Sequence, residues 1–210
     1  MFADFRMSIV ANRLRDIVSS LFIMAYEKYR REDFERVQIL PRHQKDLDVL
    51  ARLLAKLRVA FHRRIYHEEY EGKRRTIDEL EVTQTDIPIR AYLQLLNFAR
   101  ANALIRKVPT FLGMPMVDDH SMRLVAKLAI GSTSHNIQKI LLYLLRNQEE
   151  VTLTFSEMAS DLKISKSTVS RYLSVLYQVG IISDTATPQL NEPYFSVLKK
   201  YLGGGNEENS

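Results

Sequence analysis

The chain contains no cysteine, and it has few of the residues that interrupt helices. Without cysteine, disulfide bonds and metal sites built on thiolates are excluded. Seven glycines and six prolines among 210 residues are few, which favours helices over a fold rich in strands and turns. We therefore expect a mainly helical protein.

Long apolar runs are also absent. The most apolar early stretch, Ile17 to Tyr26, is too short to cross a bilayer and is interrupted by Ser19 and Ser20. The first residues, MFADFRMS, lack the basic and apolar segments of a signal peptide. These features predict a cytoplasmic location and no membrane partner.

Patterns typical of catalysis or metal binding are missing as well. No G-x-x-x-x-G-K-[ST] phosphate loop occurs. His62 and His67 are five positions apart, so they would not lie on the same face of a helix. The group Asp118-Asp119-His120 is explained by a helix cap. We therefore predict that the protein is not an enzyme and holds no metal ion or cofactor.

The charge balance and one segment point to a nucleic acid. The formal net charge is +5, which is compatible with a polyanionic partner. Within 151–180, Thr154 and Glu157 have the spacing of a capping box and predict the start of a short helix. Ser165 is a favourable N-cap for a second helix over 166–179, and Gly180 lies where a helix can end in the left-handed conformation. The segment therefore has the pattern of a helix-turn-helix.

The second of these helices has two faces. Its apolar positions, among them Val169, Leu173 and Leu176, recur at helical spacing and predict a buried side. The opposite side carries hydroxyl groups and cations, which suit the base edges and phosphates of a major groove. For Arg171, which we expect to be exposed like Lys166, the alternative is an ion pair with Asp161 or Glu157. The predicted DNA-binding residues are Lys163, Lys166, Ser167, Thr168, Ser170, Arg171 and Ser174.

The flanking residues extend the pattern to a winged helix. An amphipathic helix is expected after Ser134, and a short strand at 152–154. A strand should begin at Ile181-Ile182, with a wing tip over 185–193 and a return strand over 194–197. The segment resembles the winged helix-turn-helix superfamily, and SKSTVSRYLSVLYQVGII is similar to the recognition helices of Crp/Fnr and MarR-like proteins. The resemblance covers the last third of the chain and implies double-stranded DNA as a partner.

Two helices are predicted near the N-terminus. The first, over 7–31, has an apolar stripe that serves either the core or a homodimer interface. The second is expected from Pro41 to about Glu69, followed by a basic loop over 71–75 that could contact phosphates. The predicted dimer-interface residues are Leu14, Ile17, Leu21 and Phe22, and the predicted phosphate contacts are Lys73, Arg74 and Arg75.

A repeated sequence pattern predicts a second winged helix over 47–118. The T-x-x-E pattern recurs at Thr76, and without gaps Asn102 then aligns with Gly180. This hypothesis predicts a positive φ at Asn102 and a β-hairpin over 104–117. The alternative is a purely helical lead-in domain, in which a helix over 87–101 packs in a bundle.

The expected organisation has three parts: a helical N-terminal domain over 1–130, a winged helix-turn-helix over 134–202 and a disordered tail over 203–210. The function predicted first is that of a DNA-binding transcriptional regulator acting as a homodimer in the cytoplasm, on the nucleoid when bound to DNA. One alternative is a replication initiator or segregation accessory protein with tandem winged helices. Another is an assembly adaptor whose winged helix binds protein.

Overall fold

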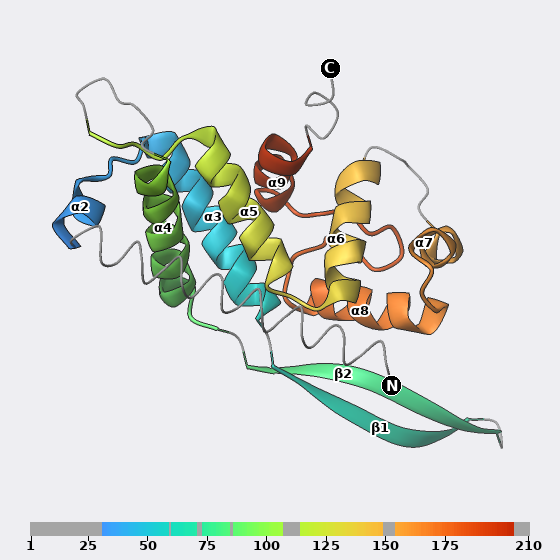
Figure 1. Cartoon of the computed structure of the whole chain (residues 1–210). Coiled ribbons are helices and arrows are strands. Elements are labelled where there is room, and N and C mark those ends of the chain that lie inside the picture. The colour runs from blue at the N-terminus through green and yellow to red at the C-terminus, as the bar shows by residue number, and fades with distance from the viewer. Residues whose placement is uncertain are drawn as a thin grey trace, which may run out of the picture.

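The computed structural model describes residues 31–58, 60–70, 73–84, 86–106, 114–148 and 154–203. This part of the chain is mainly helical, as the composition predicted (Figure 1). Its elements are α2 (Arg31–Arg36), α3 (Pro41–Leu57), β1 (Ala60–Tyr70), β2 (Lys73–Gln84), α4 (Pro88–Ile105), α5 (Asp119–Gly131), α6 (His135–Asn147), α7 (Phe155–Leu162), α8 (Lys166–Gln178) and α9 (Tyr194–Leu202).

Helices α3, α4 and α5 pack side by side and form one half of the described structure (Figure 1). Helix α3 begins at Pro41, whose fixed φ suits a first helical turn. Its apolar residues recur every three or four positions, so that Leu47, Leu50 and Leu54 share one face and are buried. These leucines form the centre of the core between α3, α4 and α5.

The core continues without a break into the C-terminal helices. Leu141 of α6, Leu173 of α8 and Leu198 of α9 belong to the same buried cluster as the leucines of α3. Helix α9 lies against α3, α5 and α6 and so returns the end of the chain to its first half. Between α5 and α6, the residues Gly131, Ser132 and Thr133 form a tight turn. The Ser132 amide donates to the Leu128 carbonyl at 3.0 Å.

Polar contacts fasten α9 to α3. The carboxylate of Asp46 accepts hydrogen bonds from the Lys200 ammonium at 2.5 Å and from the Tyr201 hydroxyl at 2.6 Å. Burial, with the hydrogen bond to Asp46 second, raises the pKa of the Tyr201 phenol well above its ordinary value. Tyr201 therefore stays a neutral donor at any working pH.

The start of α5 is held by a polar cluster. Asp118 is the N-cap and accepts from the Ser121 amide at 2.8 Å, as expected for a helix cap, while Arg106 donates to both of its carboxylate oxygens. The buried ring of His43 contacts the Val117 carbonyl at 3.0 Å and the Asp119 carboxylate at 2.8 Å. The cluster therefore fixes the first turns of α3 and α5 relative to each other.

The structure corrects the prediction for residues 58–84. Helix α3 ends at Leu57 and does not reach Glu69, because residues 60–84 form an antiparallel hairpin. Its register runs from Ala60 opposite Gln84 to Tyr70 opposite Lys73, with an irregularity at Ala60/Phe61. Lys73, Arg74 and Arg75 accordingly belong to β2 and do not form a basic loop. Aromatic and β-branched residues in β1 favour the extended backbone.

The hypothesis of a second winged helix is also wrong. Thr76, predicted to cap a helix, lies in β2. Helix α4 runs straight through Asn102, whose carbonyl accepts from the Arg106 amide at 3.1 Å and whose side chain accepts from the Ser121 hydroxyl. In the described part of 104–117, Met116 pairs in parallel with Gln38 and takes no part in a wing.

Two predictions fall outside the described residues. The helix over 7–31, with the dimer-interface residues Leu14, Ile17, Leu21 and Phe22, lies almost entirely within the first 30 residues. The tail beyond Gly203 is likewise not described. Both remain predictions from the sequence.

Candidate nucleic-acid interface

Helix α7 begins with the predicted capping box. The Thr154 hydroxyl oxygen accepts from the Glu157 amide at 3.2 Å, and the Thr154 amide donates to the Glu157 carboxylate at 3.0 Å. The hydrogen bond from the Thr154 side chain lowers the pKa of Glu157, so the box is formed by the ionised carboxylate. Two otherwise unpaired amides at the start of α7 are thereby satisfied.

The turn between α7 and α8 depends on Lys163, which adopts the left-handed conformation with φ 54° and ψ 46°. Its amide donates to the Ser160 carbonyl at 3.2 Å, and the Ile164 amide donates to the Ala159 carbonyl at 3.1 Å. This hydrogen-bond pair is a Schellman motif, in which glycine is the usual residue. A lysine here costs about 1–2 kcal/mol of backbone strain and places an exposed cation in the turn before α8.

Helix α8 has the predicted caps. The Ser165 hydroxyl accepts from the Thr168 amide at 3.1 Å, which confirms Ser165 as the N-cap. The helix ends at Gln178, and Gly180 has the expected positive φ of 65°. There the Gly180 amide donates to the Tyr177 carbonyl and the Ile181 amide to the Leu176 carbonyl, both at 2.8 Å. The chain therefore reverses sharply after α8.

A short wing follows, with its return strand earlier than predicted. Ile182 pairs antiparallel with Leu190, flanked by bonds from the Ser183 amide to Gln189 and from the Asn191 amide to Ile181, each at 2.9 Å. Residues 194–197, predicted as the return strand, instead begin α9, because their apolar positions have helical spacing. The expected strand at 152–154 lies largely outside the described residues.

The end of α8 is tied to the first half of the molecule by Lys56 of α3. Its ammonium donates to the Gly180 carbonyl at 3.2 Å and stands 5.2 Å from the centre of the Tyr194 ring. A cation at this point also complements the negative carboxyl end of α8. The position of α8 is thus set by α3 as well as by α6 and α7.

The faces of α8 separate the predicted DNA-binding residues into two groups. Lys166, Ser167 and Ser170 are exposed, as is Lys163 in the turn before the helix. The side chains of Thr168, Arg171 and Ser174 are only partly exposed. For Arg171 this corrects the expectation of an exposed side chain. Lysine and serine side chains therefore dominate the accessible strip of α8.

Sequence reasoning missed Tyr177 on this strip. Its side chain is 52% exposed, and it follows Ser170 and Ser174 at helical spacing along the same face. An exposed aromatic ring with a terminal hydroxyl can contact a thymine methyl group and a phosphate. The spacing of 170, 174 and 177 was the available signal.

The two carboxylates considered as partners of Arg171 accept hydrogen bonds from other residues. Glu157 belongs to the capping box, and Asp161 accepts from the Tyr143 hydroxyl at 2.9 Å. Strand β2 also contacts α8, on the side opposite α6 (Figure 1). The contact between β2 and α8 could not be predicted, because residues 60–84 were expected to form helix and loop.

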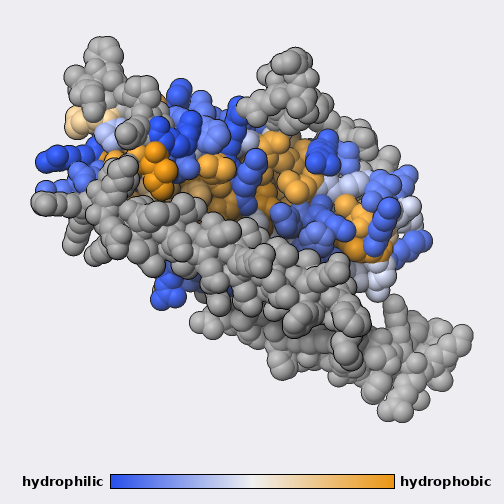
Figure 2. Space-filling model, in the orientation of Figure 1, coloured by the Kyte–Doolittle hydropathy of each residue, from blue (hydrophilic) through white to orange (hydrophobic). Residues whose placement is uncertain are grey.

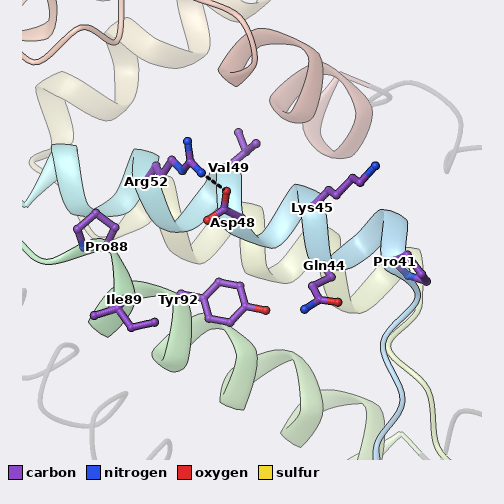
Figure 3. A pocket seen from close by; sticks show the side chains of 9 residues that line it. All are labelled: Pro41, Gln44, Lys45, Asp48, Val49, Arg52, Pro88, Ile89 and Tyr92. Atoms are coloured by element: carbon purple, nitrogen blue, oxygen red, sulfur yellow. Dashed lines mark ion pairs between the residues drawn. The ribbon is translucent and has the colours of Figure 1, made fainter.

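An open groove of about 820 Å³ lies elsewhere, between α3 and α4 (Figure 3). Asp48 and Arg52 form an ion pair of 2.6 Å at its edge, and the exposed Ile89 and the ring of Tyr92 line the opposite wall. Figure 2 shows, in the orientation of Figure 1, apolar residues in a band across the described atoms, with hydrophilic residues above the band and between its patches.

Capped α7, the left-handed turn, capped α8 and the following wing define a helix-turn-helix domain of the DNA-binding kind. Residues 137–184 match the family described as bacterial regulatory protein, arsR family, a range that covers most of α6, all of α7 and α8, and the first residues of the wing. The match supports the winged helix-turn-helix predicted for the C-terminal third of the chain. Neither a curated protein nor a solved structure matches the chain.

Two further features are absent from the described residues. Among them, no group of three or more His, Cys, Asp or Glu side chains is arranged to hold a metal ion. In the same part of the chain, no helix combines the length and the apolar character needed to span a bilayer.

Proposed function

We propose that the protein is a DNA-binding transcriptional regulator that places α8 in a major groove. The proposal rests on the accessible strip of α8, which consists of the exposed residues Lys166, Ser167, Ser170 and Tyr177. These residues lie on one side of a helix whose N-terminus is capped by Ser165. The arsR-family match over 137–184 supports the same function.

The chemistry of the strip suits both parts of DNA recognition. Lys163 and Lys166 would pair with phosphates, which gives affinity and makes binding sensitive to salt. The hydroxyl groups of Ser167 and Ser170 can donate to or accept from base edges, which gives selectivity. The wing after α8 would rest against the neighbouring backbone.

We further propose that the regulator acts as a homodimer. Two recognition helices on one duplex raise the effective concentration of each, and a two-fold axis matches a palindromic site. The support is the apolar stripe predicted over 7–31, with Leu14, Ile17, Leu21 and Phe22. Light scattering at micromolar concentration tests this directly, and a monomer would return the stripe to the intramolecular core.

Selection from random duplexes, followed by binding across a salt series, tests the main proposal. A regulator should enrich a defined site and bind it about a thousandfold or more above random DNA at physiological salt. A steep salt dependence without enrichment would indicate a chromosome-coating protein, and no binding would indicate an adaptor for proteins. The tandem winged helices that favoured a replication role are not present in the described residues of 47–118.

A further inference from the structure

Helix α4 has a row of apolar side chains that no described residue covers. Six large hydrophobic side chains are exposed in the described part of the chain, and four of them lie on α4 or directly before it: Ile87, Ile89, Leu93 and Ile105. At 100° per residue, Ile89, Leu93 and Leu96 fall within about 60° of one another around the helix. Ile89 is 61% exposed, Leu93 is 50% exposed and Leu96 is partly exposed. These three residues form the α4 stripe.

The open groove between α3 and α4 lies beside the α4 stripe. Ile89 belongs to both surfaces, and the Tyr92 ring stands next to it on the same wall (Figure 3). Val49 of α3, partly buried against the core, lines the opposite wall. Single exposed apolar side chains are ordinary on a protein, whereas a row of them that continues into a groove marks a contact surface.

A polar group without a partner continues the α4 stripe toward the carboxyl end of the helix. Arg100 follows Leu96 one turn later on the same side of α4. Its Nε atom is buried, yet no acceptor among the described residues binds it. A buried donor without an acceptor is costly, so the element that covers the α4 stripe should bring an oxygen acceptor to this end.

The N-terminal part of the chain ends beside α4. The thirty residues before Arg31 lie outside the described ones, and Arg31 begins α2, which packs against α4 (Figure 1). Shortly after α2, the Gln38 carbonyl accepts from the Val117 amide at 2.9 Å. The next residue, Asp118, accepts from Arg106 at the carboxyl end of α4. The first thirty residues are therefore tethered near that end of α4.

The helix predicted over 7–31 matches the α4 stripe in length and in pattern. At 1.5 Å per residue it would extend about 37 Å, and the 18 residues of α4 extend about 27 Å. A helix that runs back from Arg31 along α4 is therefore long enough to reach Ile89. It would place apolar side chains on apolar side chains, and Glu27 provides a carboxylate four residues before the tether. The tether also raises the effective concentration of this segment at α4.

We propose that the apolar side of residues 7–30 packs on the α4 stripe of its own chain. The inference goes beyond the proposed function and does not depend on DNA binding by α8. It is also compatible with the proposed homodimer. From Ile17 to Phe22 the predicted apolar side spans about 140°, and a helix that packs on one surface buries about 100°. The Phe22 edge therefore stays available to a second copy.

Thiol labelling of the full-length chain measures the cover of α4 directly, because the chain has no cysteine of its own. A lone Leu93→Cys thiol should react with a maleimide about tenfold or more slowly than the same thiol in a chain that also carries Leu14→Ser and Leu21→Ser. These two substitutions interrupt the apolar side of the N-terminal segment. Ile105→Cys is the matched control, since Ile105 is 54% exposed and lies about 120° around α4 from Leu93. It should react at the same rate in both backgrounds, which also shows that the double substitution leaves α4 folded.

The pattern of protection decides between the possible occupants of the α4 stripe. Slow labelling of Leu93→Cys that is lost in the double variant and unchanged on dilution of the protein supports packing within one chain. Protection that dilution removes would identify a second copy as the occupant and would overturn the proposal. Equal labelling rates of Leu93→Cys in the two backgrounds would overturn it as well, because the N-terminal segment would then not cover α4.

Discussion

Replacing Lys163 by glycine should make the protein more stable and a poorer DNA binder. Lys163 has φ 54° and ψ 46°, a conformation that costs an ordinary L-residue about 1–2 kcal/mol. Glycine removes that strain but returns about 0.4–1 kcal/mol through the greater freedom of the unfolded chain. The net gain should be about 0.5–1 kcal/mol, which corresponds to about 2 °C in Tm for a chain of this size.

The same substitution removes an exposed cation next to α8. DNA affinity should fall, and the slope of log affinity against log salt should decrease by about one. Lys163→Asn is the matched control, because asparagine also tolerates the left-handed region and removes the same charge. It should lower DNA affinity equally and change stability less. Urea unfolding and a salt series of binding measure both effects, and a Lys163→Gly variant less stable than wild type would refute the strain argument.

Three further outcomes follow from single contacts. Gly180→Ala should lower the free energy of unfolding by about 1–2 kcal/mol in urea, since φ there is 65° and the added carbon would stand 3.4 Å from the Lys56 ammonium. The hydrogen bond from His43 lowers the pKa of Asp119 and outweighs burial, which acts in the opposite direction. The ionised Asp119 carboxylate therefore stabilises the folded protein above the unfolded pKa near 3.8, and this stabilisation is lost as pH falls through the lower folded pKa. Asp119→Asn should therefore lose stability at pH 7 and show a flatter stability profile below pH 4 in pH-dependent urea unfolding. Tyr177→Ala should weaken DNA binding in a mobility-shift assay and leave Tm within about 2 °C of wild type, because the ring is 52% exposed.

The helix-turn-helix could be predicted because its signals are local. Thr154 with Glu157, Ser165 with Thr168, and Gly180 each act within a few residues, so sequence spacing alone specifies the caps. The left-handed Lys163 could not be predicted, because no lysine preference marks that conformation. The extent of the wing was misjudged where Tyr194 begins α9.

The hairpin was missed for a different physical reason. Leu57, Phe61 and Ile65 repeat every four residues, which continues the stripe of α3 but is equally an even spacing on a strand. Helical and strand periodicities coincide at that spacing, so the pattern cannot separate them. The contact of β2 with α8 joins segments far apart in the chain, and no local rule reports it.

The central claim is that the accessible strip of α8 binds DNA, and paired lysine substitutions test it most directly. Lys166→Ala removes an exposed cation from α8, and Lys127→Ala removes another exposed cation, from α5 and away from the proposed interface. Fluorescence anisotropy with a duplex at physiological salt should show a Kd raised about threefold or more for Lys166→Ala, with little change for Lys127→Ala. Equal affinities for the two variants, with both folded, would contradict the assignment of α8 to the groove.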